Sequence, residues 1–328
     1  MRHPLTSAPH PDQRGAALLG LMLLFFLGGM SWLLARMSTT SAQIHRDRIT
    51  TAAMGEAKAA LIGRAAQDAP PPAPPSGAHP GSLPCPALNT LGNTPLFTGN
   101  ACPSYIGRLP WKTLDLPELR DANGEQLWYV LTPELRDHPT AEPINSLTSL
   151  SLSINGTNNI AALLFSAGAP LPNQNGRPSN NAADYLDGSN SDGDSAYISG
   201  VTSPIFNDKV LVITRNDIFR VANQRVLAEI RGPDDNSPAL PQYGLRRYHA
   251  QNGSFPWADG NKDGHADNGE SLGGLPYNDL DLAAARPWLD ANGWLPLIKY
   301  QRVNADSAIV SIGSNTMNVI PCPTSPCP

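Results

Sequence analysis

The sequence is poor in charged and aromatic residues. Only 16% of its 328 residues are Asp, Glu, Lys or Arg, and only 6% are Phe, Trp or Tyr, whereas soluble domains average about 25% charged residues. This shortage excludes a coiled coil, a helical repeat array and a highly charged disordered chain. The net charge of −5 leaves no broad basic surface to neutralise phosphates, so we expect no nucleic acid among the partners.

Catalytic motifs are missing as well. The sequence has no nucleophile elbow, zinc-protease motif, phosphate-binding loop or dinucleotide fingerprint in a suitable context. Its 7 histidines are scattered, and none stands at metal-ligand spacing from another. We therefore expect that the protein is not an enzyme. Turn-forming residues are abundant instead, with 33 prolines and 28 glycines, which favours a loop-rich fold.

One apolar run stands near the N-terminus. Residues Ala16–Ala35 carry no charge over 20 positions, which is about the length that a membrane-spanning helix needs. A cleaved signal peptide is the alternative, with a weak site at Thr40–Ala42, although its apolar core would normally be shorter. The proline-free, Ala-rich stretch Ser38–Ala66 predicts a continuation of the same helix, ended by a Pro-rich linker over 67–80. The sequence thus predicts a single-pass inner-membrane protein whose globular part is periplasmic or extracellular.

The residues before this run carry a resemblance. A polar leader, residues 1–15, ends in Gln13-Arg14-Gly15, and the apolar run follows at once. This resembles the type IV pilins and type II secretion pseudopilins, and the resemblance implies cleavage by a prepilin peptidase between Gly15 and Ala16. Most members carry Glu five residues into the mature chain, where this sequence has Gly20. The resemblance is therefore to minor subunits, and a missing carboxylate is tolerated best at a filament tip.

The pilin resemblance also implies partners. These are other pilin or pseudopilin subunits, an inner-membrane assembly platform, the prepilin peptidase and the membrane itself. The expected function is that of a minor subunit of a type IV pilus or type II secretion filament, which caps or initiates the fibre. The alternative is a membrane-anchored periplasmic or surface calcium-binding protein with an adhesive or scaffolding role. Cleavage at Gly15 separates the two, because only a filament subunit needs it.

The cysteines follow the pattern of an exported protein. There are four, Cys85, Cys102, Cys322 and Cys327, and their spacing is not that of a zinc site. An even number in an exported chain indicates disulfides. We expect Cys85–Cys102 and Cys322–Cys327, while the sequence leaves other pairings open.

The most informative pattern is an internal repeat. Four short blocks recur in the same order, at offsets of 166 to 172 residues, which predicts a duplication. The pairs are 81–85 with 253–257, 107–111 with 273–277, 114–116 with 280–282, and 121–124 with 290–293.

Apolar runs that suit strands follow in each copy. In the first copy they lie at 127–132, 159–166 and 209–214, and in the second at 294–300, 308–312 and 317–320. Ahead of the second copy, Thr214 and Asp217 resemble a capping pair, and apolar residues at helical spacing predict a helix over Arg215–Arg231. A further short helix is expected over Leu245–Asn252. The sequence therefore predicts an α+β fold, in which a long N-terminal transmembrane helix precedes two tandem pilin-like helix-plus-antiparallel-sheet modules, 81–213 and 214–328.

The second module contains a predicted calcium loop. Residues Asp259–Glu270 fit the EF-hand loop pattern, in which alternating oxygens point at one centre, Gly264 permits a sharp turn and the last Glu closes the shell. His265 would offer only its backbone carbonyl. The flanking residues are not those of a regulatory EF-hand, so we expect a structural Ca2+ clip. The expected ligand positions are Asp259, Asn261, Asp263, His265, Asp267 and Glu270.

A second polar stretch has no such pattern. Residues Asn173–Asp194 are rich in Asn, Asp, Gly and Ser but lack a Gly at the place that a calcium loop requires. This composition predicts a disordered surface loop.

Overall fold

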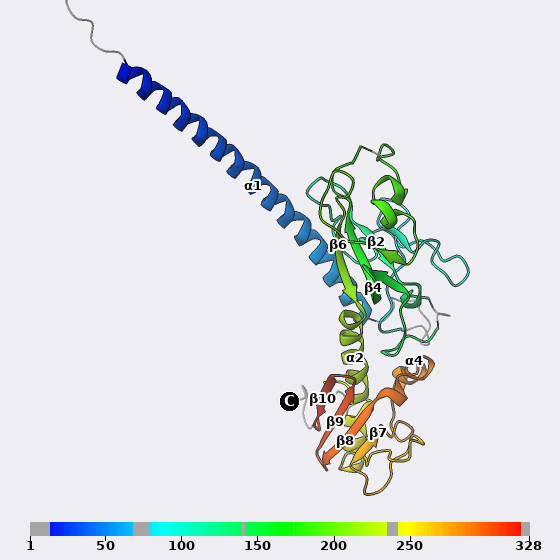
Figure 1. The fold of residues 1–328 in the computed structure, drawn as a ribbon. Coiled ribbons are helices and arrows are strands. Elements are labelled where there is room, and N and C mark those ends of the chain that lie inside the picture. The colour runs from blue at the N-terminus through cyan, green and yellow to red at the C-terminus, as the bar shows by residue number, and fades with distance from the viewer. Residues whose placement is uncertain (1–13, 68–78, 139–141, 173, 235–241, 323–328) are drawn as a thin grey trace, which may run out of the picture. The chain divides into compact units, whose positions relative to one another are not determined.

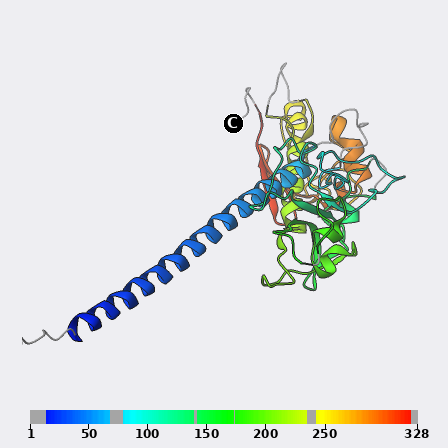
Figure 2. The same ribbon diagram turned by 90° about the horizontal axis from the view of Figure 1, so that it is seen from above.

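The computed structural model describes residues 14–67, 79–138, 142–172, 174–234 and 242–322. The chain divides into two compact units, Met1–Ile49 and Thr50–Pro328. Helix α1 (Arg14–Ala66) belongs to both, and it is uninterrupted in both views of the ribbon (Figure 1, Figure 2). The expected leader (1–15) lies almost wholly outside the described residues, as does most of the Pro-rich linker (67–80).

Helix α1 corrects the expected membrane anchor. Within the described residues, no helix combines the length and the apolar content that crossing a membrane requires. The transmembrane helix expected over Ala16–Ala35, and the single-pass inner-membrane location that rested on it, are therefore wrong. The fold is α+β with two sheets, without that anchor.

The first sheet is organised around its longest strand, β4. Its strands are β1 (Ile106–Arg108), β2 (Trp128–Leu131), β3 (Leu152–Ile154), β4 (Thr157–Ser166), β5 (Ala196–Tyr197) and β6 (Lys209–Thr214). Strands β2 and β3 share one edge of β4, and β6 pairs antiparallel along the other. The turn Asn155-Gly156 joins β3 to β4, and both of its residues have positive φ, as a two-residue type I′ turn requires.

The second sheet is a plain antiparallel meander. Its order is β10-β9-β8-β7, with β7 at Leu272–Gly274, β8 at Lys299–Asn304, β9 at Ser307–Ile312 and β10 at Asn315–Val319. Alternate residues of β9 are buried, namely Ala308, Val310 and Ile312, because successive side chains point to opposite faces of a sheet. The expected strand over 294–300 is wrong in its first half. A 3-10 turn, η6 (Leu295–Leu297), stands there instead, because Pro296 suits the start of a turn and cannot donate to a strand ladder.

Helices cover one face of each sheet. Helix α2 (Arg215–Arg231) packs on β9 and β10, and α3 (Gly244–Asn252) lies against α2. The predicted capping pair is present, because the Thr214 side chain accepts from the Asp217 backbone and the Asp217 side chain accepts from the Thr214 backbone. The remaining helical segments are short: η2 (Pro133–Leu135), η3 (Ala182–Asp184), η4 (Gly188–Ser191), η5 (Ala283–Ala285) and α4 (Arg286–Ala291).

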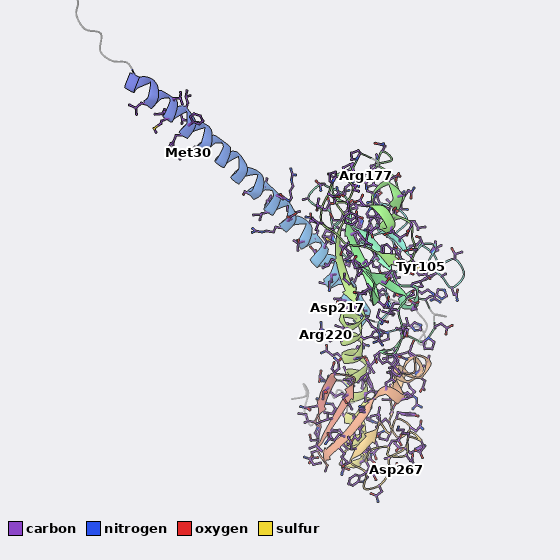
Figure 3. The ribbon with its side chains drawn as sticks, viewed as in Figure 1. Met30, Tyr105, Arg177, Asp217, Arg220 and Asp267 are labelled. Atoms are coloured by element: carbon purple, nitrogen blue, oxygen red, sulfur yellow. A yellow bond between two sulfur atoms is a disulfide. The ribbon has the colours of Figure 1, made fainter. Side chains whose placement is uncertain are left out.

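Lys58 of α1 forms hydrogen bonds to both β6 and α2 at the point where β6 ends and α2 begins. Its Nζ donates to the Val212 carbonyl of β6 at 2.9 Å and to Asp217 Oδ2 of α2 at 2.9 Å. Lys58 itself lies on α1, whose residues Ala57 and Leu61 are fully buried in the same core. The expected module boundary between residues 213 and 214 falls at this junction (Figure 1, Figure 3).

Four strands of the first sheet correspond in order to the four strands of the second, and β1 and β7 overlap a matched pair of repeat blocks. The order β1-β2-β4-β6 corresponds to β7-β8-β9-β10, with antiparallel pairing at each step. An isolated bridge joins Ala87 to Arg108 on the outer side of β1, and another joins Asp259 to Gly274 on the outer side of β7. These pairs stand at the repeat offsets of 172 and 166 residues.

The same close approach explains one glycine in each copy. A Cβ on Gly107 would lie 2.5 Å from the Ala87 carbonyl oxygen, and one on Gly273 would lie 2.4 Å from the Asp259 carbonyl oxygen. Real Cβ atoms do not come so near to a backbone oxygen. Each β-bridge therefore requires glycine at this position.

The outer face of the first sheet is covered by the chain itself. Trp128, Val130 and Phe165 form a second core with side chains from residues 182–197. The expected disordered loop over Asn173–Asp194 is therefore wrong for its described residues, because η3 and η4 lie there and Tyr185 and Leu186 are buried.

One expected disulfide is confirmed. Cys85 and Cys102 are bonded, with their Cα atoms 5.6 Å apart. Cys327 lies outside the described residues, so the pairing of Cys322 with Cys327 stays a prediction.

Candidate functional site

The loop Asp259–Glu270 lies between α3 and β7, beside the bridge that Asp259 makes with Gly274 (Asp267 marks it in Figure 3). Its sharp turn depends on Gly264, which has φ +89°. A Cβ there would lie 2.4 Å from Asn278 Nδ2 and 2.9 Å from the Tyr277 ring. Both the backbone angle and the crowding exclude other residues at this position.

Two carboxylates of the loop accept hydrogen bonds from the loop's own backbone. Asp259 is only 2% exposed, and its two oxygens accept from the backbone N–H groups of Asp263 at 3.1 Å and Gly264 at 2.8 Å. Asp267 Oδ2 accepts from the N–H groups of Gly260 at 2.9 Å and Asn261 at 3.0 Å. These bonds brace the loop through Asp259 and Asp267, whereas the other predicted ligand residues are exposed, namely Asn261, Asp263, His265 and Glu270.

The loop is not drawn together around one centre. Within the described residues, no three His, Cys, Asp or Glu side chains form a group that could hold a metal ion. The Asp263 carboxylate accepts from the His265 backbone, and the Glu270 side chain lies against Gly260. The residue types and the turn suit Ca2+. The aspartate carboxylates, however, accept hydrogen bonds from backbone N–H groups of the loop and do not converge on one point.

Asp279 is a member of this site that sequence reasoning missed. Its carboxylate pairs with His265 Nδ1 at 2.7 Å and accepts from the Ala266 backbone at 2.7 Å. The hydrogen bond with Asp279 raises the pKa of the His265 imidazole. Asp279 stands outside the loop pattern, so no spacing in the sequence identifies it.

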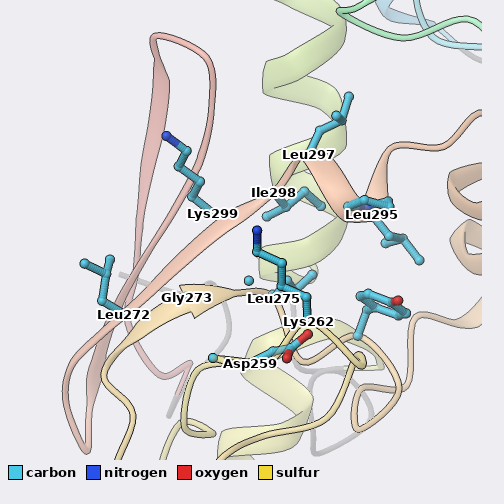
Figure 4. Close-up of a pocket in the computed structure, with 13 residues that line it drawn as sticks. Asp259, Lys262, Leu272, Gly273, Leu275, Leu295, Leu297, Ile298 and Lys299 are labelled. Carbon is cyan, nitrogen blue, oxygen red and sulfur yellow. The ribbon is translucent and has the colours of Figure 1, made fainter.

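A pocket of about 760 Å³ adjoins the loop (Figure 4). Its floor contains Leu275, Leu295 and Ile298, which are buried in the core. Two lysines line it, Lys262 from the loop and Lys299 from the start of β8. Lys262 has φ +65°, a backbone region that residues other than Gly, Asn and Asp adopt at a cost.

A second group of buried acids lies over the first sheet. Asp208 Oδ2 accepts from the Asp187 backbone at 2.8 Å and from Asn190 Nδ2 at 2.9 Å. Among the described residues, Asp208 Oδ1 is buried without a hydrogen-bond partner. Desolvation by burial raises the pKa of Asp208 to about 7.

The first unit carries a different kind of feature, an apolar segment of α1. Its large side chains between Leu19 and Met30 are between 55% and 77% exposed. Consecutive residues of a helix point in all directions around its axis, so this exposure is not confined to one face. The predicted cleavage site Gly15–Ala16 lies in the first turn of the same helix.

Comparison of the chain with protein-family models, with curated proteins and with solved structures finds no match in any of the three.

Proposed function

We propose that this protein is a minor subunit of a pilin-like filament. The observation that carries the proposal is the exposed apolar segment Leu19–Met30 on a helix whose other end, Thr50–Ala66, packs in the globular core. A helix that is apolar on all sides is normally buried in other structure. In a filament, the matching helices of neighbouring subunits supply that cover, and the globular unit is displayed outside.

The residues around the first turn of α1 support the same reading. The order Gln13-Arg14-Gly15 followed by an uncharged run is the arrangement that prepilin peptidases cut in the pilin class. Gly20 takes the place where most pilins carry a carboxylate, and the globular part is large for a repeating subunit. Both features favour a subunit that initiates or caps the fibre, with other pilin-like subunits as partners.

The test is the N-terminal residue and intact mass of the protein, made in cells with and without a prepilin peptidase. We expect a mature chain that begins at Ala16 only when the peptidase is present. The matched control is Gly15→Val, which should stay uncut in both hosts because the residue before the cut must be small. A wild-type chain that still begins at Met1, or one that begins near Gln43 in either host, would remove the filament proposal.

We also propose that Asp259–Glu270 binds Ca2+ as a structural clip. The support is the residue pattern, the positive φ at Gly264 and the inward placement of Asp259. Binding requires the loop carboxylates to give up their hydrogen bonds from backbone N–H groups and to coordinate the ion instead. The site would hold the loop against β7 and would not drive a large opening, because no long helices flank it.

A further inference from the structure

The pocket beside β7 occupies a face that is covered in the first sheet. Arg108 of β1 pairs with Trp128, and the matched Gly274 of β7 pairs with Lys299. In the first sheet the Arg108 guanidinium lies 4.1 Å from the centres of the Trp128 and Tyr185 rings. Tyr185 comes from the chain segment that covers this face. In the second sheet the matched position has no side chain, and the pocket lies there.

Among the described residues, neither a close contact nor the backbone angle requires glycine at position 274. Its φ is not in the left-handed region, and a Cβ would meet Asp259 atoms no nearer than 3.5 Å, which is ordinary contact. The matched strand β1 carries an Arg at this place, so the β-bridge does not require glycine either. Glycine inside a strand often marks a site where a ligand or another backbone approaches closely.

The charge at the pocket indicates what approaches. Lys262 and Lys299 line it, and neither ammonium has a hydrogen-bond or ion-pair partner in the part of the chain that the structure describes. Asp259 also faces the pocket, but its two oxygens are engaged by the backbone of the loop. Among the charged side chains that line the pocket, the two unengaged ones are therefore cations, and they share the lining with Leu275 and Ile298 (Figure 4).

We propose that this pocket docks an extended peptide segment of a partner protein, with an apolar side chain on the floor and a neighbouring carboxylate between Lys262 and Lys299. The partner segment would cover the second sheet as residues 182–197 cover the first. The pocket volume of about 760 Å³ accommodates one large side chain and the adjoining backbone, within the usual range for binding pockets. The inference goes beyond the proposed filament function and does not depend on it, although the pocket shares Asp259 and Lys262 with the proposed calcium loop.

The test is a peptide array read with labelled full-length protein. Each spot carries a Gly-Ser hexapeptide in which one apolar residue precedes Asp, Glu, Ser, Lys or Arg. We expect binding to the spots with an apolar residue followed by Asp or Glu, and a loss of at least tenfold in affinity for the best peptide when Ser replaces the acid. Preference for Lys or Arg spots, or an array without any signal, would overturn the proposal.

Three variants locate the binding. Gly274→Leu fills the pocket without a clash at Cβ and should abolish the signal, while Lys262→Gln and Lys299→Gln should each weaken it several-fold. Lys112→Gln, a lysine that lies over Trp111 in the first module, is the matched control and should change nothing. Circular dichroism and the melting temperature check that each variant is folded.

A free amphiphile would be a different ligand, and competition separates the two. Decanoate should displace the peptide only weakly, because it lacks a backbone to lie along Gly274. If decanoate binds while no peptide does, or if the folded Gly274→Leu variant binds peptide as the wild type does, the peptide proposal is wrong.

Discussion

Removing the charge of Asp208 should stabilise the protein at neutral and alkaline pH. This carboxyl group is 4% exposed, and its Oδ1 has no hydrogen-bond partner among the described residues. Burial holds its pKa at about 7 in the folded protein, against about 3.9 in an unfolded chain. The folded state therefore favours the neutral acid. The substitution Asp208→Asn keeps the shape of the side chain and cannot ionise.

The direction and size of the stability change follow from the linkage between proton binding and folding. Below pH 4 both states hold the proton, and Asp208 imposes no ionisation penalty. As the pH rises from about 4 to about 7, the unfolded chain loses the proton first, so the free energy of unfolding falls. A shift of about 3 pKa units corresponds to an upper limit of about 4 kcal/mol. An unpaired amide N–H on the substituted side chain costs about 1–3 kcal/mol in return, so we expect a net gain of about 1–3 kcal/mol at pH 8.

The assay is urea denaturation of wild type and variant at pH 4.5, 6 and 8. The difference in unfolding free energy should grow with pH and level off above pH 7. Asp187→Asn is the matched control, because both Asp187 oxygens accept hydrogen bonds, including the N–H groups of Asn207 and Asp208. That variant should lose stability at every pH tested. If Asp208→Asn is less stable than wild type at pH 8, the reasoning fails. It also fails if the difference in unfolding free energy between variant and wild type is the same at all three pH values.

Three further predictions concern stability. Addition of 5 mM CaCl2 should stabilise the wild type by about 1–2 kcal/mol, given the weak affinities of extracellular calcium sites. In a thermal melt it should leave the melting temperature of Asp263→Asn unchanged; equal shifts in the melting temperatures of wild type and variant would exclude the loop as the site. Thr214→Ala removes the capping box of α2 and should cost about 1 kcal/mol in urea denaturation. Gly273→Ala should cost more stability than Gly274→Ala, because a Cβ at 273 would lie 2.4 Å from the Asp259 carbonyl oxygen and one at 274 would lie 3.5 Å from it. The reverse order of melting temperatures would contradict the bridge geometry.

The elements with a strong local signal could be predicted from the sequence. Helix α2 has the predicted bounds Arg215–Arg231, because Thr214 and Asp217 form its cap and its apolar spacing is helical. Strand β6 also has its predicted bounds, Lys209–Thr214, since an apolar run ends at that cap. One pair of repeat blocks, 107–111 and 273–277, overlaps β1 and β7, which occupy matching places in the two sheets. All of these signals are carried by neighbouring residues or by internal comparison.

The parts that could not be predicted depend on contacts between distant segments. Residues 174–194 have the composition of a disordered loop, yet Gln174 donates to Asp187. The Asp187 and Asn190 side chains also bond to residues 207 and 208. The pairing of Asp279 with His265 crosses 14 residues without a motif. The pocket lies where the described part of the chain places no counterpart of the segment that covers the first sheet. Composition alone cannot indicate which loop will cover which face.

The Lys58 contacts have a mechanical consequence. Thr214 ends β6 and also caps α2, so no linker residues separate the first sheet from the helix that packs on the second sheet. Lys58 ties the Thr50–Ala66 part of α1 to both sides of that joint. A force applied through this part of α1 would therefore act on β6 and α2 at the same point, in addition to the core contacts of Ala57 and Leu61. Because no flexible linker lies between β6 and α2, the joint would transmit that force from the strand to the helix directly.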